Sequence, residues 1–103
     1  MGEYVTGQGA RLRCLRDYLG LSVSEIAAVL DVSPRSYQSF ESGRAAIPEG
    51  VMAEVRAHVH RLDEKAGEFA QAGTVSLYGL SRFDLRALSI AVAANDQLQL
   101  TPL

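Results

Sequence analysis

The chain has 103 residues, of which 48% are hydrophobic and 21% charged. This composition excludes a disordered tail and suits one packed domain with a small additional segment, and no apolar run approaches the roughly 20 residues that span a bilayer. The formal net charge of −2 is unfavourable for a nucleic-acid partner. However, several arginines lie in the first 44 residues, so one face can still be basic: Arg11, Arg13, Arg16, Arg35 and Arg44.

Three short helices are predicted in the first half of the chain. Residues 8–19 carry an apolar stripe at helical spacing and end at Gly20. Ser22 and Glu25 have the spacing of a capping box, which predicts a second helix to about Leu30.

The third helix is expected to begin at Ser33, a favourable N-cap residue, with Pro34 in the first helical position. Tyr37 and Phe40 are three residues apart and predict its buried face, and Gly43 ends it.

A long fourth helix is predicted from Pro48 to about Ala72. Its apolar residues recur three and four positions apart, which permits either ordinary packing within one chain or a seam against a second copy or the C-terminal segment. These residues are Met52, Val55, Val59, Leu62, Ala66 and Phe69.

The pattern changes after Gly73. It predicts a strand over residues 74–78, a mostly apolar helix over 83–94 and a last strand over 97–100. Two short strands around one helix are too little to be stable alone, so we expect them to join the helical part or a partner subunit.

We therefore divide the chain into a helical domain, residues 1–72, which contains the three short helices, and a C-terminal segment, residues 73–103, which is expected to dimerise. The fold class expected is mainly α, with a small β-α-β segment at the end. The residues expected to form the dimer are Leu62, Phe69, Val75, Leu77, Leu85, Leu88, Val92 and Leu98.

The order and spacing of several short motifs resemble those of the lambda-repressor-like (Cro/repressor, Xre-type) helix-turn-helix family over roughly residues 10–60. The motifs are Leu19-Gly20-Leu21, Glu25-Ile26-Ala27, Val32-Ser33 and Glu41-Ser42-Gly43-Arg44. The run from Ser33 to Arg44, followed by Ile47-Pro48, is similar to the YdiL-like group, which includes anti-CRISPR-associated repressors of phages and mobile elements. That resemblance implies a dimer built by the C-terminal elements.

The outward residues of the third helix are the expected base readers, since such a helix inserts its first turns into the major groove. Arg35 has the planar fork that matches guanine, and Gln38 can pair with adenine. Ser36 and Ser39 are short enough to bond bases or phosphates. The alternative for each is an ordinary solvated residue.

Phosphate contacts are expected at Arg44, just after the third helix, and at Ser22 and Ser24, at the start of the second. For Ser22 the capping role is an alternative explanation. Val23 stands where the family often has glutamine, so it cannot make the backbone contact of that glutamine.

The resemblance also implies that Glu41 does not face DNA. In the family the glutamate at this place pairs with an arginine of the first helix, and Arg16 matches that arginine. Arg16 and Glu41 are therefore expected to form a structural ion pair, which is costly to break from one side.

No enzyme is expected. His58 and His60 point to different sides of a helix, and the sequence has neither zinc-ligand spacing nor a phosphate-binding glycine loop. We accordingly predict no metal, no cofactor, no small-molecule ligand and no membrane partner. The lone Cys14 and the lack of an apolar signal region favour a cytoplasmic, nucleoid-associated protein.

The predicted function is sequence-specific binding of double-stranded DNA by a homodimeric transcriptional repressor, which recognises a palindromic operator and could act on its own operon. The alternative is an antitoxin-type module, with a helix-turn-helix head and a tail that binds a protein. The two differ in the tail, because an antitoxin tail is usually disordered alone, whereas residues 74–100 are patterned to fold.

Overall fold

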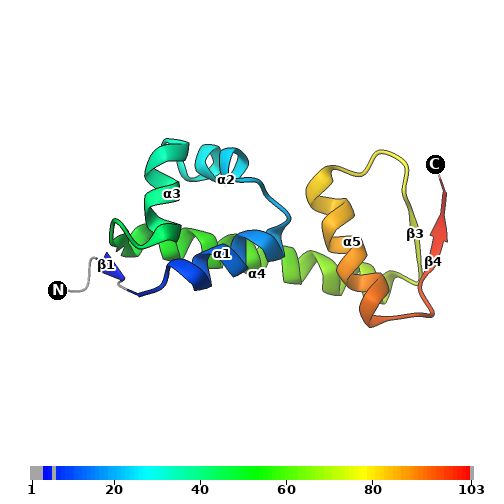
Figure 1. Ribbon diagram of the computed structural model, residues 1–103. Coiled ribbons are helices and arrows are strands. Elements are labelled where there is room, and N and C mark those ends of the chain that lie inside the picture. The colour runs from blue at the N-terminus through cyan, green and yellow to red at the C-terminus, as the bar shows by residue number, and fades with distance from the viewer. Residues whose placement is uncertain (1–3, 6, 103) are drawn as a thin grey trace. The chain divides into compact units, whose positions relative to one another are not determined.

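The computed structural model describes residues 4–5 and 7–102, with side chains from residue 7 onward, and Figure 1 traces its elements. The chain divides into two compact units, one ending at Val59 and the other beginning at His60. This boundary lies inside helix α4 (Glu49–Ala72), whereas the sequence pattern placed it after residue 72.

The first unit contains the three predicted helices, α1 (Gly9–Leu19), α2 (Val23–Leu30) and α3 (Pro34–Ser42). Helix α1 ends at Gly20, whose φ of 74° lies in the left-handed region that glycine adopts without a steric penalty. The prediction of three short helices from capping residues and apolar spacing is confirmed.

The connection between α2 and α3 is a tight turn fixed by hydrogen bonds. Asp31 adopts a φ of 58°, and its backbone N–H is directed at the carbonyls of Ala27 and Ala28. Val32 N–H donates to the Ala27 carbonyl at 3.0 Å, and Ser33 then caps α3 by accepting from Ser36 N–H. Three residues thus join the two helices, and their hydrogen-bonded backbone restricts the angle between α2 and α3.

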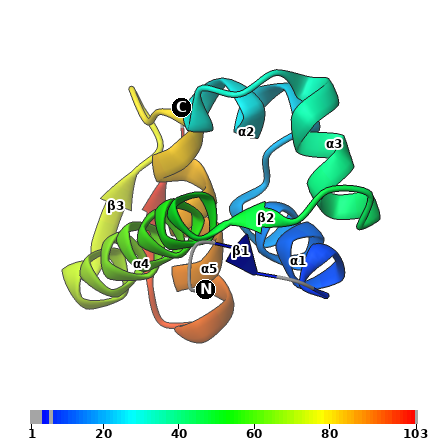
Figure 2. The same cartoon turned by 90° about the vertical axis from the view of Figure 1, so that its left-hand side faces the viewer.

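A small antiparallel sheet, which the sequence did not predict, also belongs to this unit. Strand β1 (Tyr4–Val5) pairs with β2 (Ile47–Pro48), with Val5 opposite Ile47. Figure 2 shows the two strands side by side. Strands of two residues carry no detectable periodicity, which explains the omission. Pro48 belongs to β2, so α4 begins one residue later than expected.

The core of the first unit forms where α3 packs against α1 and α2. Apolar side chains from every helix of the unit enter it, together with one from β2. The buried residues are Leu12, Leu19, Ile26, Ala27, Leu30, Tyr37, Phe40, Ile47, Met52 and Val55.

The second unit combines the later part of α4 with β3 (Thr74–Ser76), α5 (Arg82–Ala94) and β4 (Gln99–Thr101). The strands pair in parallel and α5 connects them, which confirms a small C-terminal strand pair around one helix. Their bounds differ from the predicted ones. A turn at Gly79, with a φ of 75°, follows β3, and the Asn95 side chain accepts from Gln97 N–H, which delays β4.

Burial within the two units answers part of the question that the heptad spacing left open. Four of the six stripe residues, Met52, Val55, Leu62 and Ala66, are buried within the single chain. The buried residues of the second unit are Leu62, Ala66, Val75, Ala87, Leu88 and Ala91. The Asn95 side-chain amide also donates to the Ala70 carbonyl at 2.9 Å, which ties the end of α5 to α4.

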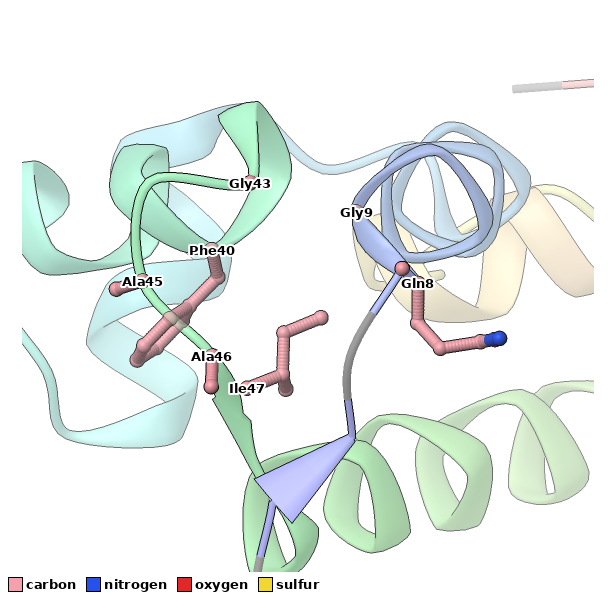
Figure 3. A pocket seen from close by; sticks show the side chains of 8 residues that line it. Gln8, Gly9, Phe40, Gly43, Ala45, Ala46 and Ile47 are labelled. Carbon is pink, nitrogen blue, oxygen red and sulfur yellow. The ribbon is translucent and has the colours of Figure 1, made fainter.

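The start of α1 lies against the end of α3, and only a glycine fits at this crossing. A Cβ added to Gly9 would lie 2.8 Å from the Phe40 carbonyl oxygen and closer still to that of Glu41. Figure 3 shows Gly9 facing this end of α3, beside a small pocket of about 110 Å³ that Phe40 and Ile47 help to line. The close approach of the two backbones therefore depends on the absence of a side chain at position 9.

We predict that Gly9→Ala lowers the free energy of unfolding by about 1–3 kcal/mol, because two backbone carbonyls must move to admit the methyl group. Gly67→Ala is the matched control, since a Cβ at this exposed position of α4 meets nothing within 4 Å. The control should gain up to about 1 kcal/mol from helix propensity. Thermal melts of both variants measure the difference, and equal stabilisation of both would contradict the close approach.

Candidate nucleic-acid interface

Helix α3 is fixed in the first unit by its two aromatic residues and its N-cap. Tyr37 and Phe40 are buried and meet edge to face, with ring centroids 6.4 Å apart. At the start of the helix, the Ser33 hydroxyl accepts from Ser36 N–H at 3.0 Å. The opposite face, which carries the predicted base readers, is therefore held in a defined orientation.

The structure brings Arg16 and Glu41 together in a two-pronged ion pair between α1 and α3. Arg16 Nε donates to Glu41 Oε2 at 2.7 Å, and Nη2 donates to Oε1 at 3.2 Å. Nη1 donates to the Leu21 carbonyl at 3.2 Å, so the same guanidinium also fixes the chain between α1 and α2. The side chains are only 12% and 13% exposed. Such geometry combines charge with directional hydrogen bonds, and it joins three segments of the fold.

The titration of Glu41 reflects this environment. Burial alone would raise the pKa of its carboxyl, but hydrogen bonds from Arg16 and the charges of Arg16 and Arg13 outweigh burial, and its pKa is lowered. The hydrogen bond to Glu41 in turn raises the pKa of Arg16. Both groups therefore stay charged at neutral pH, and the Glu41 carboxylate is committed to its pair with Arg16.

The Tyr37 hydroxyl is buried beside this pair. Burial, followed by the neighbouring Glu41 carboxylate, raises its pKa, so it stays protonated. Its approach to the carboxylate lacks hydrogen-bond geometry, and no other described residue accepts from it. Tyr37 thus contributes apolar packing and a neutral dipole next to the ion pair.

The predicted base readers lie on the outward face of α3, but they differ in what they can still donate. Arg35, Ser36 and Gln38 are exposed, and Ser39 is half-buried. The Ser33 hydroxyl donates to Ser36 Oγ, which leaves the Ser36 proton free, whereas Ser39 Oγ donates to the Arg35 carbonyl at 3.1 Å. Among the described residues Arg35 has no ion-pair partner. Its guanidinium is therefore available to a ligand.

The predicted phosphate contacts are placed less uniformly. The Ser22 hydroxyl accepts from Glu25 N–H at 3.1 Å, and Ser22 N–H donates to the Glu25 carboxylate at 2.8 Å, so the capping box occupies this helix start. Ser24 is exposed on the first turn of α2, and Arg44 is exposed just beyond α3. Of these three residues only Arg44 carries a positive charge, so it is the strongest candidate for a phosphate contact.

A shallow hollow adjoins the outward face of α3, and sequence reasoning did not include its α1 wall. Arg13 and Cys14 of α1 line it opposite Gln38 and Ser42 of α3. Arg13 is also in an exposed contact of 3.7 Å with Asp17. The only signal in the sequence was the cluster of arginines in the first helix, which does not indicate how they lie relative to α3.

The residues predicted to form a dimer separate into two groups. Leu62, Val75 and Leu88 are buried within the chain, so they form the core of the second unit rather than a free surface. Leu85 and Val92 are exposed, and three others are partly exposed, namely Phe69, Leu77 and Leu98.

Two structural findings concern metal binding and membranes, and both apply to residues 4–5 and 7–102. No group of three or more His, Cys, Asp and Glu side chains in this part of the chain could hold a metal ion. None of the helices described there is long and apolar enough to cross a membrane.

We predict that Glu41→Gln lowers the free energy of unfolding at pH 7 by roughly 3 kcal/mol, because it leaves the Arg16 charge half-buried without its counter-ion. Asp17→Asn is the control. It also removes a carboxylate near Arg16, but Asp17 is 60% exposed and 3.8 Å away, so the loss should be under about 1 kcal/mol. Urea unfolding of the three proteins measures both changes.

The same variant carries a pH test. The pKa of Glu41 is lowered in the folded state, so its contribution to stability is present above the unfolded-state pKa and is lost as the pH falls through the folded-state pKa. The wild type should therefore lose more stability than Glu41→Gln when the pH falls below the ordinary pKa of a glutamate, 4.5. Parallel losses in the two proteins would show that Glu41 is not a stabilising carboxylate.

Comparison with known proteins agrees with this geometry. Residues 9–67 match the family model described as a helix-turn-helix domain, a span that begins at α1 and continues into α4. No curated protein matches the sequence significantly. Because the matched span covers more than half of the chain and contains the α2–turn–α3 arrangement, the chain belongs to the helix-turn-helix domain family.

Proposed function

We propose that this protein is a sequence-specific, double-stranded-DNA-binding transcriptional regulator that inserts α3 into the major groove. One observation carries the proposal. Arg35 and Gln38 are exposed on the first two turns of a capped helix whose other face is anchored by Tyr37, in a chain of the helix-turn-helix domain family.

The hydrogen bonds of α3 indicate what each side chain would read. Arg35 offers the fork that matches O6 and N7 of guanine, and Gln38 can bond N6 and N7 of adenine. Ser36 keeps a free proton and suits an acceptor, such as a phosphate or guanine O6. The Ser39 hydroxyl donates its proton to the helix backbone, so its oxygen can only accept. Its proposed partner is therefore the amino group of a base.

The charge balance argues for two copies on one DNA. Residues 7–59 carry six arginines and six acidic residues, so one copy has no net positive charge with which to attract phosphates. Two symmetric copies double the phosphate contacts, and they fix two half-sites about one helical turn apart. We therefore propose a homodimer on a palindromic operator.

The second unit offers the surface for that dimer. Leu85 is 49% exposed and Tyr78 is 82% exposed, so this unit carries apolar side-chain surface that it does not itself cover. Strand β4 is exposed along its whole length, and a two-stranded sheet is marginal without additional strands. A second copy that covers these groups would bury apolar area and complete the sheet.

Repression is the simplest output of such a dimer, because a protein bound over a promoter excludes the polymerase, and its own promoter is the nearest target. The similarity of Ser33–Arg44 to the YdiL-like group supports a role in a phage or mobile element. An antitoxin role is less well supported, because the segment after residue 73 is a paired β-α-β unit rather than an extended tail. We propose no catalytic activity.

We predict that Arg35→Ala abolishes preference for the operator while the fold survives, since one arginine–guanine pair contributes roughly 1–3 kcal/mol of discrimination per half-site. The operator is first selected from random duplex DNA with the wild type, and the affinities for selected and scrambled duplexes are then compared. Arg56→Ala, an exposed arginine on α4, is the control. An unchanged preference in Arg35→Ala would exclude α3 as the reading helix.

We also predict a homodimer in light scattering at micromolar concentration, and a monomer of 11.1 kDa for Leu85→Glu, which places a charge on the exposed apolar surface. Gln71→Glu, an exposed change on α4, should stay dimeric. A wild-type monomer that binds one half-site as tightly as the palindrome would contradict the dimer.

A further inference from the structure

The last residue of α3 carries a hydroxyl whose hydrogen bonds the proposed function does not use. Gly43 ends the helix with a φ of 82°, and the chain reverses toward Arg44. Ala45 N–H then donates to the Ser39 carbonyl at 3.1 Å, which closes the turn over the end of the helix. Ser42, the last residue of α3, is exposed directly before this reversal.

The Ser42 hydroxyl connects the helix end to Arg44. Its Oγ donates to the Ser39 carbonyl at 3.2 Å and accepts from Arg44 Nε at the same distance of 3.2 Å. The Arg44 backbone N–H also approaches this oxygen, at 3.4 Å. One hydroxyl thus holds both the backbone and the side chain of Arg44 against the C-terminal end of α3.

This arrangement leaves the two terminal nitrogens of the Arg44 guanidinium available for a ligand. Nε is committed to Ser42, whereas Nη1 and Nη2 of Arg44 make no hydrogen bond with the residues that the structure describes. Two adjacent terminal nitrogens form the fork that binds a phosphate with parallel hydrogen bonds. The carbonyl end of α3 also favours a cation at this place.

We propose that Ser42 is a positioning residue for DNA binding, which holds the Arg44 guanidinium ready for a phosphate of the DNA backbone beside the recognition helix. The inference rests on the proposed function. An exposed arginine otherwise loses much of its rotamer freedom on binding, and a hydroxyl that restricts it beforehand lowers that cost. Ser42 itself then needs no contact with DNA.

The test uses the full-length protein and a fluorescent duplex of about 30 base pairs of mixed sequence, because a phosphate contact does not depend on the operator. Affinities are measured from about 50 to 200 mM salt for Ser42→Ala, Ser42→Thr, Arg44→Ala and the double variant Ser42→Ala/Arg44→Ala. Arg56→Ala is the control for Arg44→Ala, because Arg56 is also an exposed arginine but lies on α4, away from α3.

We expect Ser42→Ala to weaken binding about three- to tenfold, the range for loss of one hydrogen bond, with a nearly unchanged salt slope because no charge is lost. Ser42→Thr keeps the oxygen and should restore binding. Arg44→Ala should reduce the slope of log affinity against log salt concentration by about one for each bound protomer. In the Arg44→Ala background, removal of the Ser42 hydroxyl should have no further effect.

Three outcomes would overturn the proposal: wild-type affinity in Ser42→Ala, an unchanged salt slope in Arg44→Ala, or an equal loss from Ser42→Ala with and without Arg44. The last result would mean that Ser42 contacts DNA directly. Failure of the wild type to bind the duplex in a salt-dependent way would overturn the proposed function as well, which distinguishes it from failure of the Ser42 inference alone.

Discussion

The ion pair between Arg16 and Glu41 is the interaction on which the first unit depends. It joins α1 to α3 through two hydrogen bonds, and the third bond of Arg16, to the Leu21 carbonyl, fixes the start of the α2 segment. Both charges are largely shielded from water, so neither is tolerated without the other. The orientation of α3 relative to the other helices is therefore set by charge pairing as well as by apolar packing.

A close approach of the α1 and α3 backbones accompanies this pair. Gly9 lets the start of α1 lie against the last turn of α3, where Glu41 is located. Tyr37 and Phe40 fill the same side of α3, which leaves the opposite side for Arg35, Ser36 and Gln38. One helix thus has a buried face that anchors it and an exposed face that carries the proposed base readers.

Much of the fold could be predicted because its signals are local. Ser22, Ser33 and Gly43 mark helix ends through hydrogen bonds made within a few residues, and the spacing of Tyr37 and Phe40 identifies a buried face. The partner of Glu41 lies 25 positions away, so no local pattern specifies it, and only resemblance to a family suggested Arg16.

Other features depend on tertiary contacts that a sequence does not display. Strands β1 and β2 consist of two residues each, and they form only because the fold brings their segments together. The division of the chain within α4 was also invisible, because the apolar stripe continues without a break past Val59. The hydrogen bonds of the α3 hydroxyls depend on the acceptor within reach, which is a second hydroxyl for Ser33 and a helix carbonyl for Ser39 and Ser42, so chemically identical serines differ in what they can still donate.

A double-mutant cycle on Arg16→Met and Glu41→Gln, with free energies from urea unfolding followed by circular dichroism, tests the central claim most directly. If the pair fixes α3 to α1, the losses of unfolding free energy in the two single variants should be strongly non-additive. The coupling free energy should be about 1.5–3 kcal/mol, in the upper part of the range found for residues in contact. Additive losses, with a coupling below about 0.5 kcal/mol, would contradict the account, since the two side chains would then contribute independently.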